Sequence, residues 1–416
     1  MTIAQLRQSV QHLYYGWYLA AASAMIILVA AGVFYYGFGL LVDPLRAEFG
    51  WSALAVGAAF SLRSEVSAFS APLVGVLIDR FGPRVVMTGG ILGVAAGFVA
   101  LSQVNDLVAF YAAIIFIAAA TNLCNTQPAS VLVARWFLHN RSRALTLLAM
   151  GGGLSGLTVP AFAWAVSTHG WRVAIVLAAA ATVVICLPLA ALLKEAPKPD
   201  GPTAQAARPS AAAKGATATG DISLRASLKM RTFWFIAGAY SAAGFGAGAI
   251  FSLMVPGVIK SGVTPEQATA AATAIPVLSL SGRLCIGLLG DTFDKRYLLA
   301  ASFGMQAVGL ALLAVPSNGA LLWPFVLLFS AGYGGPIPLR TGIQAEHFGV
   351  AALGTIQGMV LFIISIGTLA GPMVVGQLAD MTGEYYGGFL AAAAMVGLGA
   401  VLVLLVPKAH RTPQDA

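Results

Sequence analysis

The sequence predicts an all-α membrane protein with twelve transmembrane helices in two six-helix halves. Of the 416 residues, 59% are hydrophobic and only 9% are charged, whereas soluble domains carry about 25% charged residues. The apolar segments are long enough to cross a bilayer at about 20 residues per helix. One long polar segment separates six of them from the other six, which predicts the two halves.

Twelve spans are expected when the apolar segments are counted along the chain in order. The first follows the sequence MTIAQLRQSVQHLYYGW, which has no small-residue cleavage site, so we expect an uncleaved helix rather than a signal peptide. The cysteines all fall in apolar segments without paired spacing, which indicates neither disulfides nor a metal site. The expected spans are residues 15–42, 53–78, 84–104, 108–134, 144–167, 171–193, 233–259, 265–289, 298–315, 320–340, 353–378 and 385–406.

The basic residues between the spans predict the orientation. With a cytoplasmic N-terminus, seventeen of the 23 Lys and Arg residues lie in inside segments, and only Arg46, Arg172 and Lys260 lie outside. This bias follows the positive-inside rule, so both termini are expected in the cytoplasm and the chain in the cell (inner) membrane. The net charge of +8 therefore reflects topology, and no nucleic-acid partner is expected.

The polar segment at residues 194–231 is expected to be a cytoplasmic linker. Its first part is rich in Ala, Pro, Lys and Thr and cannot bury a hydrophobic core. A short amphipathic surface helix is expected in its last part, DISLRASLKMRTFW. The linker separates an N-terminal bundle, residues 1–193, from a C-terminal bundle, residues 232–416.

An internal repeat marks the two halves. Gly75–Arg84 (GVLIDRFGPR) and Gly287–Arg296 (GLLGDTFDKR) share five of ten positions, 212 residues apart and after the second span of each half. The pattern resembles the loop motif of the major facilitator superfamily. That resemblance implies two parallel halves that rock about a midplane site.

The repeat also predicts a conformational latch. Asp79 can lie against the positive N-terminus of another helix, while Arg80 and Arg84 can pair with carboxylates. Asp291 is the equivalent acid of the second copy, in which Thr292 and Asp294 depart from the pattern. The alternative is that these charges only anchor helix ends at the membrane surface.

A narrower resemblance comes from residues 136–153. Trp136-Phe137, a basic cluster at Arg141 to Arg143 and an Ala/Gly-rich helix resemble the monocarboxylate transporter family and the related bacterial oxalate:formate-type carriers. His139 and Asn140 depart from that pattern. The segment that starts at Tyr36-Gly37-Phe38-Gly39 is also similar to the bacterial members.

Arg283 is the principal candidate for binding a substrate, because an arginine inside an apolar span costs about 2.5 to 3.5 kcal/mol. The resemblance implies that this residue of the eighth span holds the substrate carboxylate, a task that suits a planar guanidinium. The alternative is a fixed brace between helices. Span 11 has no Lys or Arg, so one buried arginine predicts one carboxylate.

Glu65 is the candidate proton carrier. It is the only acid expected well inside a span, where a carboxyl group is desolvated; the alternative is a structural or gating contact. Arg63, two residues earlier, points to another helix face and is not expected to pair with it. Ser279 stands where the animal carriers have an Asp, so their Asp–Arg proton relay is not implied here.

Neutral polar residues are expected to line the rest of the cavity, although each can instead form an interhelical hydrogen bond. Arg340, at the expected end of span 10, is interpreted as an interfacial anchor. The candidate lining residues are Tyr35, Tyr36, Asn122, Asn125, Gln127, Tyr240, Tyr333 and Gln357.

The sequence therefore predicts a secondary transporter of small monocarboxylates such as lactate or pyruvate, coupled to a proton. A monomer is expected to suffice, with the substrate anion, the proton and the lipid bilayer as partners. The alternatives are an efflux carrier for larger organic anions or drugs and a membrane sensor that does not transport. No catalytic triad, phosphate loop or metal spacing is present, so neither an enzyme nor a cofactor is expected.

Overall fold

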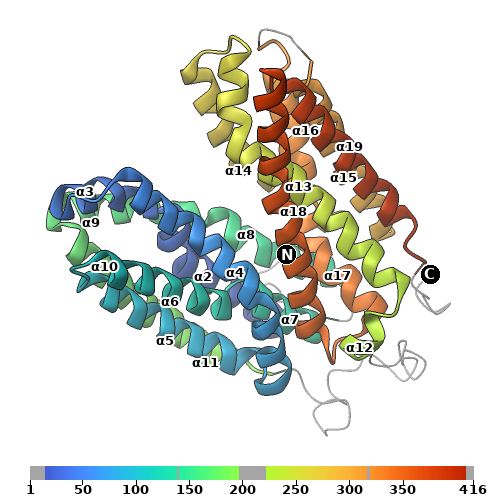
Figure 1. Ribbon diagram of the computed structural model, residues 1–416. Coiled ribbons are helices and arrows are strands. Elements are labelled where there is room, and N and C mark those ends of the chain that lie inside the picture. The colour runs from blue at the N-terminus through green and yellow to red at the C-terminus, as the bar shows by residue number, and fades with distance from the viewer. Residues whose placement is uncertain (1–14, 138–139, 196–221, 316–318, 409–416) are drawn as a thin grey trace, which may run out of the picture. The chain divides into compact units, whose positions relative to one another are not determined.

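The computed structural model describes residues 15–137, 140–195, 222–315 and 319–408, and every regular element within these ranges is a helix (Figure 1). Contacts divide the chain into two compact units. The first contains Met1–Arg63 and Phe81–Ala196, and the second contains Ser64–Arg80 and Pro197–Ala416.

Eleven helical stretches among the described residues are long and apolar enough to cross a membrane. The expected second span is the helix α4 (Ala53–Phe81), which has 29 residues but is not one of the eleven. It is also the span that contains Arg63 and Glu65, and these charges lower its hydropathy. The all-α, multi-span fold class is thereby confirmed.

Large apolar side chains are exposed along the helices. Val108 is 80% exposed and Met373 is 72% exposed. A soluble monomer rarely exposes so much apolar surface. A helix in a bilayer can do so, because its side chains face apolar lipid and its backbone groups are hydrogen-bonded within the helix. The chain is a multi-pass membrane protein.

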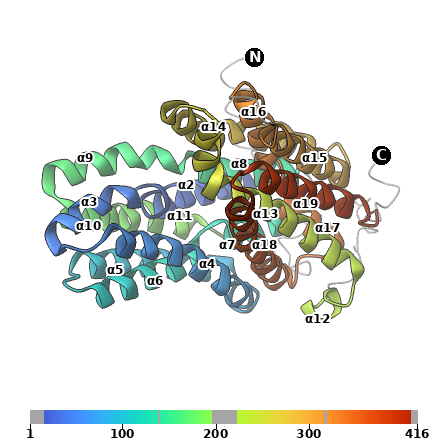
Figure 2. The ribbon, with the colours of Figure 1, turned by 45° about the horizontal axis from the view of Figure 1, so that its top comes forward.

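In the first unit, α2 packs against α8, and α5 contacts both α6 and α10. Figure 2 shows α5 and α6 side by side. Besides the first part of α4, the elements are α2 (Tyr15–Tyr36), η1 (Phe38–Leu41), α3 (Val42–Phe49), α5 (Pro83–Ser102), α6 (Leu107–Cys124), α7 (Thr126–Trp136), α8 (Arg141–Leu154), η2 (Ser155–Thr158), α9 (Val159–His169), α10 (Trp171–Ala181), the π-helix η3 (Thr182–Cys186) and α11 (Leu187–Leu192).

One end of this unit is fastened by Arg172 at the start of α10. Its guanidinium lies 2.8 Å from Glu48 of α3 and donates a hydrogen bond of 2.9 Å to the carbonyl of Val104. Trp171 donates a second bond to Glu48. A charge-assisted network of this kind holds α3 against the loop between α5 and α6.

In the second unit, α13 packs against α18 and α19, while α15 contacts α16 and α19. Thr264 and Asp294 cap the N-termini of α14 and α15 through their side-chain oxygens. Besides Ser64–Arg80 of α4, the elements are α12 (Leu224–Ser227), α13 (Arg231–Lys260), α14 (Pro265–Leu289), α15 (Lys295–Leu313), α16 (Leu322–Gly334), α17 (Pro336–Phe348), α18 (Leu353–Thr382) and α19 (Tyr386–Leu404).

Most of the expected linker lies outside the described residues. After the gap at residues 196–221, the described chain resumes at Ile222, whose N–H donates to the carbonyl of Phe348. The expected amphipathic helix is the single turn α12, which Ser223 caps.

Candidate functional site

Arg283 lies on α14, six residues before the last residue of that helix, and its side chain is half-buried. Glycines bring α14 and α16 into backbone contact beside it. A Cβ on Gly334 would lie 1.9 Å from the Ser279 carbonyl oxygen and 3.0 Å from the Arg283 backbone nitrogen. Because no side chain separates the two backbones, the position of Arg283 along α16 is fixed.

The contact of Arg283 with Gly334 occurs where the tenth span is interrupted. α16 ends at Gly334 and α17 begins at Pro336. Proline lacks the N–H that would continue the first helix, and its fixed φ suits the first turn of the second. The interruption, residues Tyr333 to Pro336, is called the α16–α17 break.

Tyr333 is held at this break by aromatic packing. Its ring is stacked on Phe329 at 6.0 Å between centroids and meets Phe251 of α13 edge-on at 5.3 Å. Such contacts fix the ring and leave the hydroxyl at its far end for polar partners. The structure therefore places Tyr333 next to Gly334, the residue that contacts the backbone of Arg283.

Tyr240 reaches the same break from α13. Its hydroxyl donates a 3.0 Å hydrogen bond to the carbonyl of Pro336, and its ring meets Phe303 of α15 edge-on. This bond joins α13 to the first residue of α17. Tyr240 is almost fully buried, so its role in the described structure is to join helices.

Arg340 is the residue whose location the sequence reasoning missed. We expected it at the end of its span, but α17 continues for eight more residues to Phe348. Arg340 instead lies near Tyr240 and Tyr333. The signal that could have placed it was the Gly-Gly-Pro sequence, which starts a new helix and so lengthens the span.

Gln357 forms an interhelical contact. It is fully buried on α18, and its Nε2 donates a 3.0 Å hydrogen bond to Thr341 Oγ1 of α17. Gln344, also on α17, is fully buried, and neither of its amide atoms has a hydrogen-bond partner among the described residues. The interface of α17 is thus unusually polar for a membrane helix.

The first unit has a comparable interruption in its fourth span. α6 ends at Cys124 and α7 begins at Thr126, and Asn125 between them is extended. The Asn125 side chain accepts hydrogen bonds from the N–H and hydroxyl of Thr126, at 2.8 and 3.1 Å. Asn125 therefore caps α7, and Asn122, a turn earlier on α6, is half-buried.

Two further lining candidates, Tyr35 and Tyr36, end α2. Their side chains lie outside the described part of the structure. Their predicted contact with substrate stays a prediction.

Arg63 is an intramembrane arginine with a structural partner. It donates a 2.5 Å hydrogen bond to the carbonyl of Phe34 and lies over the ring of the same residue at 5.3 Å. Only 4% of Arg63 is exposed. The carbonyl and the ring partly replace water around the guanidinium, so Arg63 braces α4 against α2.

Glu65 is half-buried on α4. It makes no hydrogen bond or ion pair with any residue that the structure describes, and so does not pair with Arg63. The role of Glu65 as a proton carrier stays a prediction.

The latch residue Asp79 caps a helix. Its carboxylate accepts hydrogen bonds from the backbone N–H groups of Gly354 and Thr355, at 3.1 and 2.7 Å, and from the Thr355 hydroxyl at 2.6 Å. These groups form the first turn of α18, whose unpaired N–H groups and dipole favour an anion. Gly75, one turn earlier, contacts Gly354 directly.

In this structure the Arg84 side chain binds a backbone carbonyl, and its predicted pairing with a carboxylate stays a prediction. Its guanidinium donates a 3.3 Å hydrogen bond to the carbonyl of Ala191, near the end of α11, while its backbone N–H donates to Glu195. A basic side chain at a helix C-terminus satisfies carbonyls that have no partner within the helix. Arg80 is exposed and Asp291 is half-buried.

In the second copy of the repeat the charges are paired within the second unit. Arg296 donates to Asp294 at 2.7 Å and to the carbonyl of Val406 at 2.8 Å, and Lys295 forms an ion pair with Glu346. The hydrogen bonds from Arg296 lower the pKa of Asp294 below its usual value. These pairs fasten the start of α15 to α17 and to the end of the described chain.

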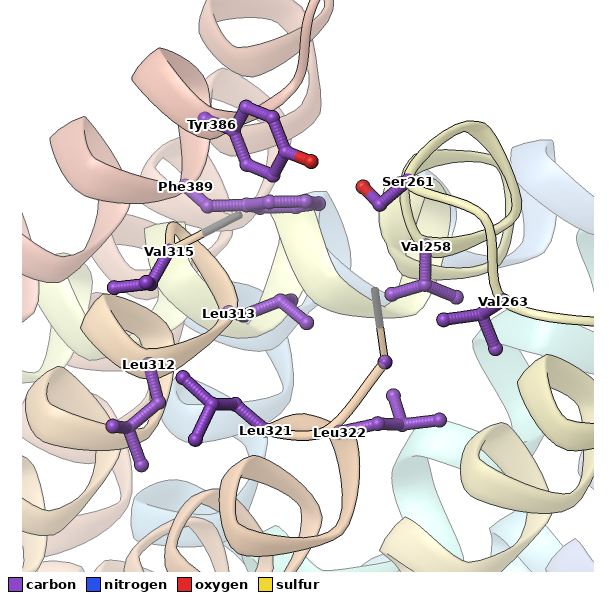
Figure 3. A pocket seen from close by; sticks show the side chains of 11 residues that line it. Val258, Ser261, Val263, Leu312, Leu313, Val315, Leu321, Leu322, Tyr386 and Phe389 are labelled. Carbon is purple, nitrogen blue, oxygen red and sulfur yellow. The ribbon is translucent and has the colours of Figure 1, made fainter. Parts of the chain in front are cut away.

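A small cavity lies apart from this site. It has a volume of roughly 20 Å³, enough for about one water molecule. Figure 3 shows mainly apolar side chains around it, with Ser261 and Tyr386 as its polar members. Its walls come from the ends of α13 and α15 and the starts of α16 and α19. Its size and lining do not suit an organic anion.

Comparisons with known proteins agree with this architecture. The family model of the Major Facilitator Superfamily matches residues 22–260 and 236–416. The chain is 28% identical over 406 residues to human monocarboxylate transporter 11, covering 95% of this chain and 83% of that protein. It is 24% identical over 341 residues to the oxalate:formate antiporter of Oxalobacter formigenes, covering 80% and 78% of the two chains.

Solved structures show the same fold. The fucose:proton symporter of E. coli matches with a TM-score of 0.70 at 17% identity, covering 95% of this chain and all of that one. The human organic anion transporter MFSD10 matches with a TM-score of 0.65 at 16% identity, covering 94% and 97%. The chain therefore belongs to the Major Facilitator Superfamily, and it is a secondary transporter rather than an enzyme.

Proposed function

We propose that the protein carries a small monocarboxylate, such as lactate or pyruvate, together with a proton, and that Arg283 binds the carboxylate. The observation that carries this proposal is a half-buried guanidinium inside α14, beside the α16–α17 break. The only acid of α14 is Glu266, in its first turn and seventeen residues before Arg283. Relatives named for monocarboxylate and oxalate:formate transport support an organic acid as cargo.

The chemistry of the guanidinium suits this role. Arginine stays charged in a dry site, and its planar fork donates two parallel hydrogen bonds to a carboxylate. Tyr333, fixed beside the break, is the neutral residue best placed to contact the rest of the acid. Substrate binding would neutralise Arg283, which lowers the cost of enclosing the site while the halves change access.

Coupling to a proton follows from the membrane potential. An anion that enters a negative-inside cell is opposed by about 2.3 kcal/mol per 100 mV, and one accompanying proton cancels this term. In the proposed topology both termini are cytoplasmic and the protein lies in the cell (inner) membrane. A monomer contains all the residues that this cycle uses.

Uptake into proteoliposomes tests the proposal. A panel of C1 to C6 mono- and dicarboxylates is compared with and without an imposed pH gradient, for the wild type and for Arg283→Gln. Monocarboxylates should accumulate and acid outside should accelerate them, while Arg283→Gln should lose at least roughly 90% of uptake and still fold, since one charge-assisted hydrogen bond contributes about 1.5 to 3 kcal/mol. Arg225→Gln, at an exposed arginine of α12, is the matched control.

Normal accumulation by Arg283→Gln would contradict the proposal. Accumulation of only larger organic anions would instead favour an efflux carrier. Saturable binding without counterflow of labelled lactate would favour a sensor that does not transport.

A further inference from the structure

Arg340, half-buried on α17, has no hydrogen-bonding partner among the residues that the structure describes. Its Nε is buried, and no residue that the structure describes accepts a hydrogen bond from its side chain or forms an ion pair with it. Other cations of the second unit differ in this respect, since Lys295 is paired with Glu346 and Arg296 with Asp294. A charge removed from water is costly to leave uncompensated.

The charged end of Arg340 lies toward the α16–α17 break. Arg340 is four residues after Pro336, the first residue of α17, and lies near Tyr240 and Tyr333. Tyr240 itself hydrogen-bonds the carbonyl of Pro336, and Tyr333 immediately precedes the glycines of the break. The guanidinium therefore extends back along α17 toward the break rather than toward Phe348.

The helices that pack against α17 bring no acid close to Arg340. The segments α15 and α16 contain no Asp or Glu, and α14 has only Glu266 at its far end. The acid of α18, Asp380, lies 23 residues beyond Gln357, the residue that contacts α17, and Glu346 of α17 is paired with Lys295. A bound anion would supply the negative charge that these helices do not place beside Arg340.

Arg283 approaches the same break from α14, because its backbone nitrogen lies against Gly334. Arg340 approaches it from α17. Two guanidinium-bearing residues of different helices therefore flank one helix interruption, whereas the sequence had suggested a single cation.

We propose that Arg340 is a second anion-binding residue of the second unit, which takes a negative charge in addition to the one held by Arg283. The ligand group is a small anion that accepts hydrogen bonds from a guanidinium. Beside a transported monocarboxylate it is a separate small anion such as a halide. If it is instead a second acidic group on the transported acid, the cargo is a dicarboxylate and the monocarboxylate part of the proposed function is wrong. The identity of the transported acid in this inference rests on the proposed function.

Gln344 extends the same polar surface. It lies four residues after Arg340, on the same face of α17, and both of its amide atoms are buried without partners among the described residues. An amide can donate to an anion as well as accept from a guanidinium. Gln344 is therefore the residue of α17 best placed to support a ligand held by Arg340.

Binding to the purified full chain tests the inference. Thermal shift in detergent, in HEPES buffer without other added anions, is titrated with sodium acetate, sodium malonate or sodium chloride. If the second charge belongs to the substrate, the wild type should bind malonate at least roughly tenfold more tightly than acetate, and Arg340→Gln should abolish that difference. If it is a halide, chloride should bind saturably and without competing with acetate, and Arg340→Gln should abolish that binding.

Arg340→Lys keeps the positive charge, and it replaces Arg340→Gln in the binding experiment if Arg340→Gln does not fold. It should retain chloride binding but weaken malonate, because a lysine cannot donate as a planar fork. The inference is overturned if the wild type shows neither a malonate preference nor saturable chloride binding, or if Arg340→Gln leaves both unchanged. The affinity for acetate is measured separately on the Arg283→Gln variant. If this variant bound acetate as tightly as the wild type, the proposed function, rather than this inference, would be contradicted.

Discussion

At the scale of single residues, two arginines of the predicted spans, Arg63 and Arg340, differ in what surrounds their guanidinium groups. Arg63 donates to the carbonyl of Phe34 and lies over its ring, so the protein itself supplies its environment. Arg340 has two tyrosines near it but no acceptor among the described residues. The first arrangement is typical of a structural brace and the second of a residue that awaits a ligand.

Asp79 is a residue whose contribution to stability can be measured directly. Asp79→Ala removes the side-chain acceptor for two N–H groups of α18 and should destabilise the fold by about 0.5 to 2 kcal/mol. Asp79→Asn keeps one acceptor and should cost less. Thermal unfolding in detergent measures both, with Asp380→Ala, at an exposed acid, as the control. Equal melting temperatures for Asp79→Ala and Asp380→Ala would rule out this cap.

The sequence was more informative about which residues carry chemistry than about what surrounds them. Arg283 could be selected as a candidate binding residue from the sequence alone, because it is a charged residue within a long apolar segment. The surroundings of Arg340 could not be predicted, because they depend on a span that runs eight residues past the expected end. The contact of Arg84 with a carbonyl rather than a carboxylate was hidden for a similar reason, since helix ends are defined by three-dimensional capping.

At the scale of elements, the fourth span of each half is interrupted. In the first unit the interruption is at Asn125, which caps α7, and in the second it lies between Gly334 and Pro336. The internal repeat makes these two spans equivalent. Gly334, Gly335 and Pro336 mark the second interruption in the sequence, whereas the first was not expected, because Asn125 was considered only as a lining residue.

The contact between Gly334 and α14 beside Arg283 predicts that even a small side chain at position 334 destabilises the protein. Gly334→Ala places a methyl group 1.9 Å from the Ser279 carbonyl oxygen, so α14 and α16 must separate, at a cost of about 1 to 3 kcal/mol. Affinity for the transported acid should fall as well, because Arg283 moves with α14.

Gly304→Ala is the matched control for this change. Gly304 lies inside α15, and a Cβ there has no atom within 4 Å outside its own helix backbone. It should leave stability unchanged or raise it by about 0.5 to 1 kcal/mol, since alanine favours a helix. Thermal unfolding and substrate titration compare the two variants, and similar behaviour of both would contradict the role given to the contact.

At the scale of the whole molecule, one continuous helix belongs to both compact units. The boundary passes through α4 between Arg63 and Ser64, so that Arg63 packs in the first unit and Glu65 belongs to the second. A helix, rather than a loop, therefore connects the units at this point. Glu65 lies two residues after Arg63, just beyond this boundary.

Glu65→Gln tests the predicted role of Glu65 as a proton carrier. The amide keeps the size of the side chain but cannot release a proton, so an imposed pH gradient should no longer accelerate uptake. Counterflow of labelled substrate, which needs no net proton movement, should continue at about the wild-type rate. Uptake assays in proteoliposomes with and without the gradient measure both. Full acid stimulation in Glu65→Gln would assign the proton to another residue.

The direct apposition of α14 and α16 has a consequence for selectivity. Where Gly282 and Gly334 let two main chains touch, the base of Arg283 has no freedom to slide along its neighbour. Under the proposed function, this contact limits how far Arg283 can move to accommodate a longer acid. We therefore expect uptake to fall as the carbon chain of the acid lengthens.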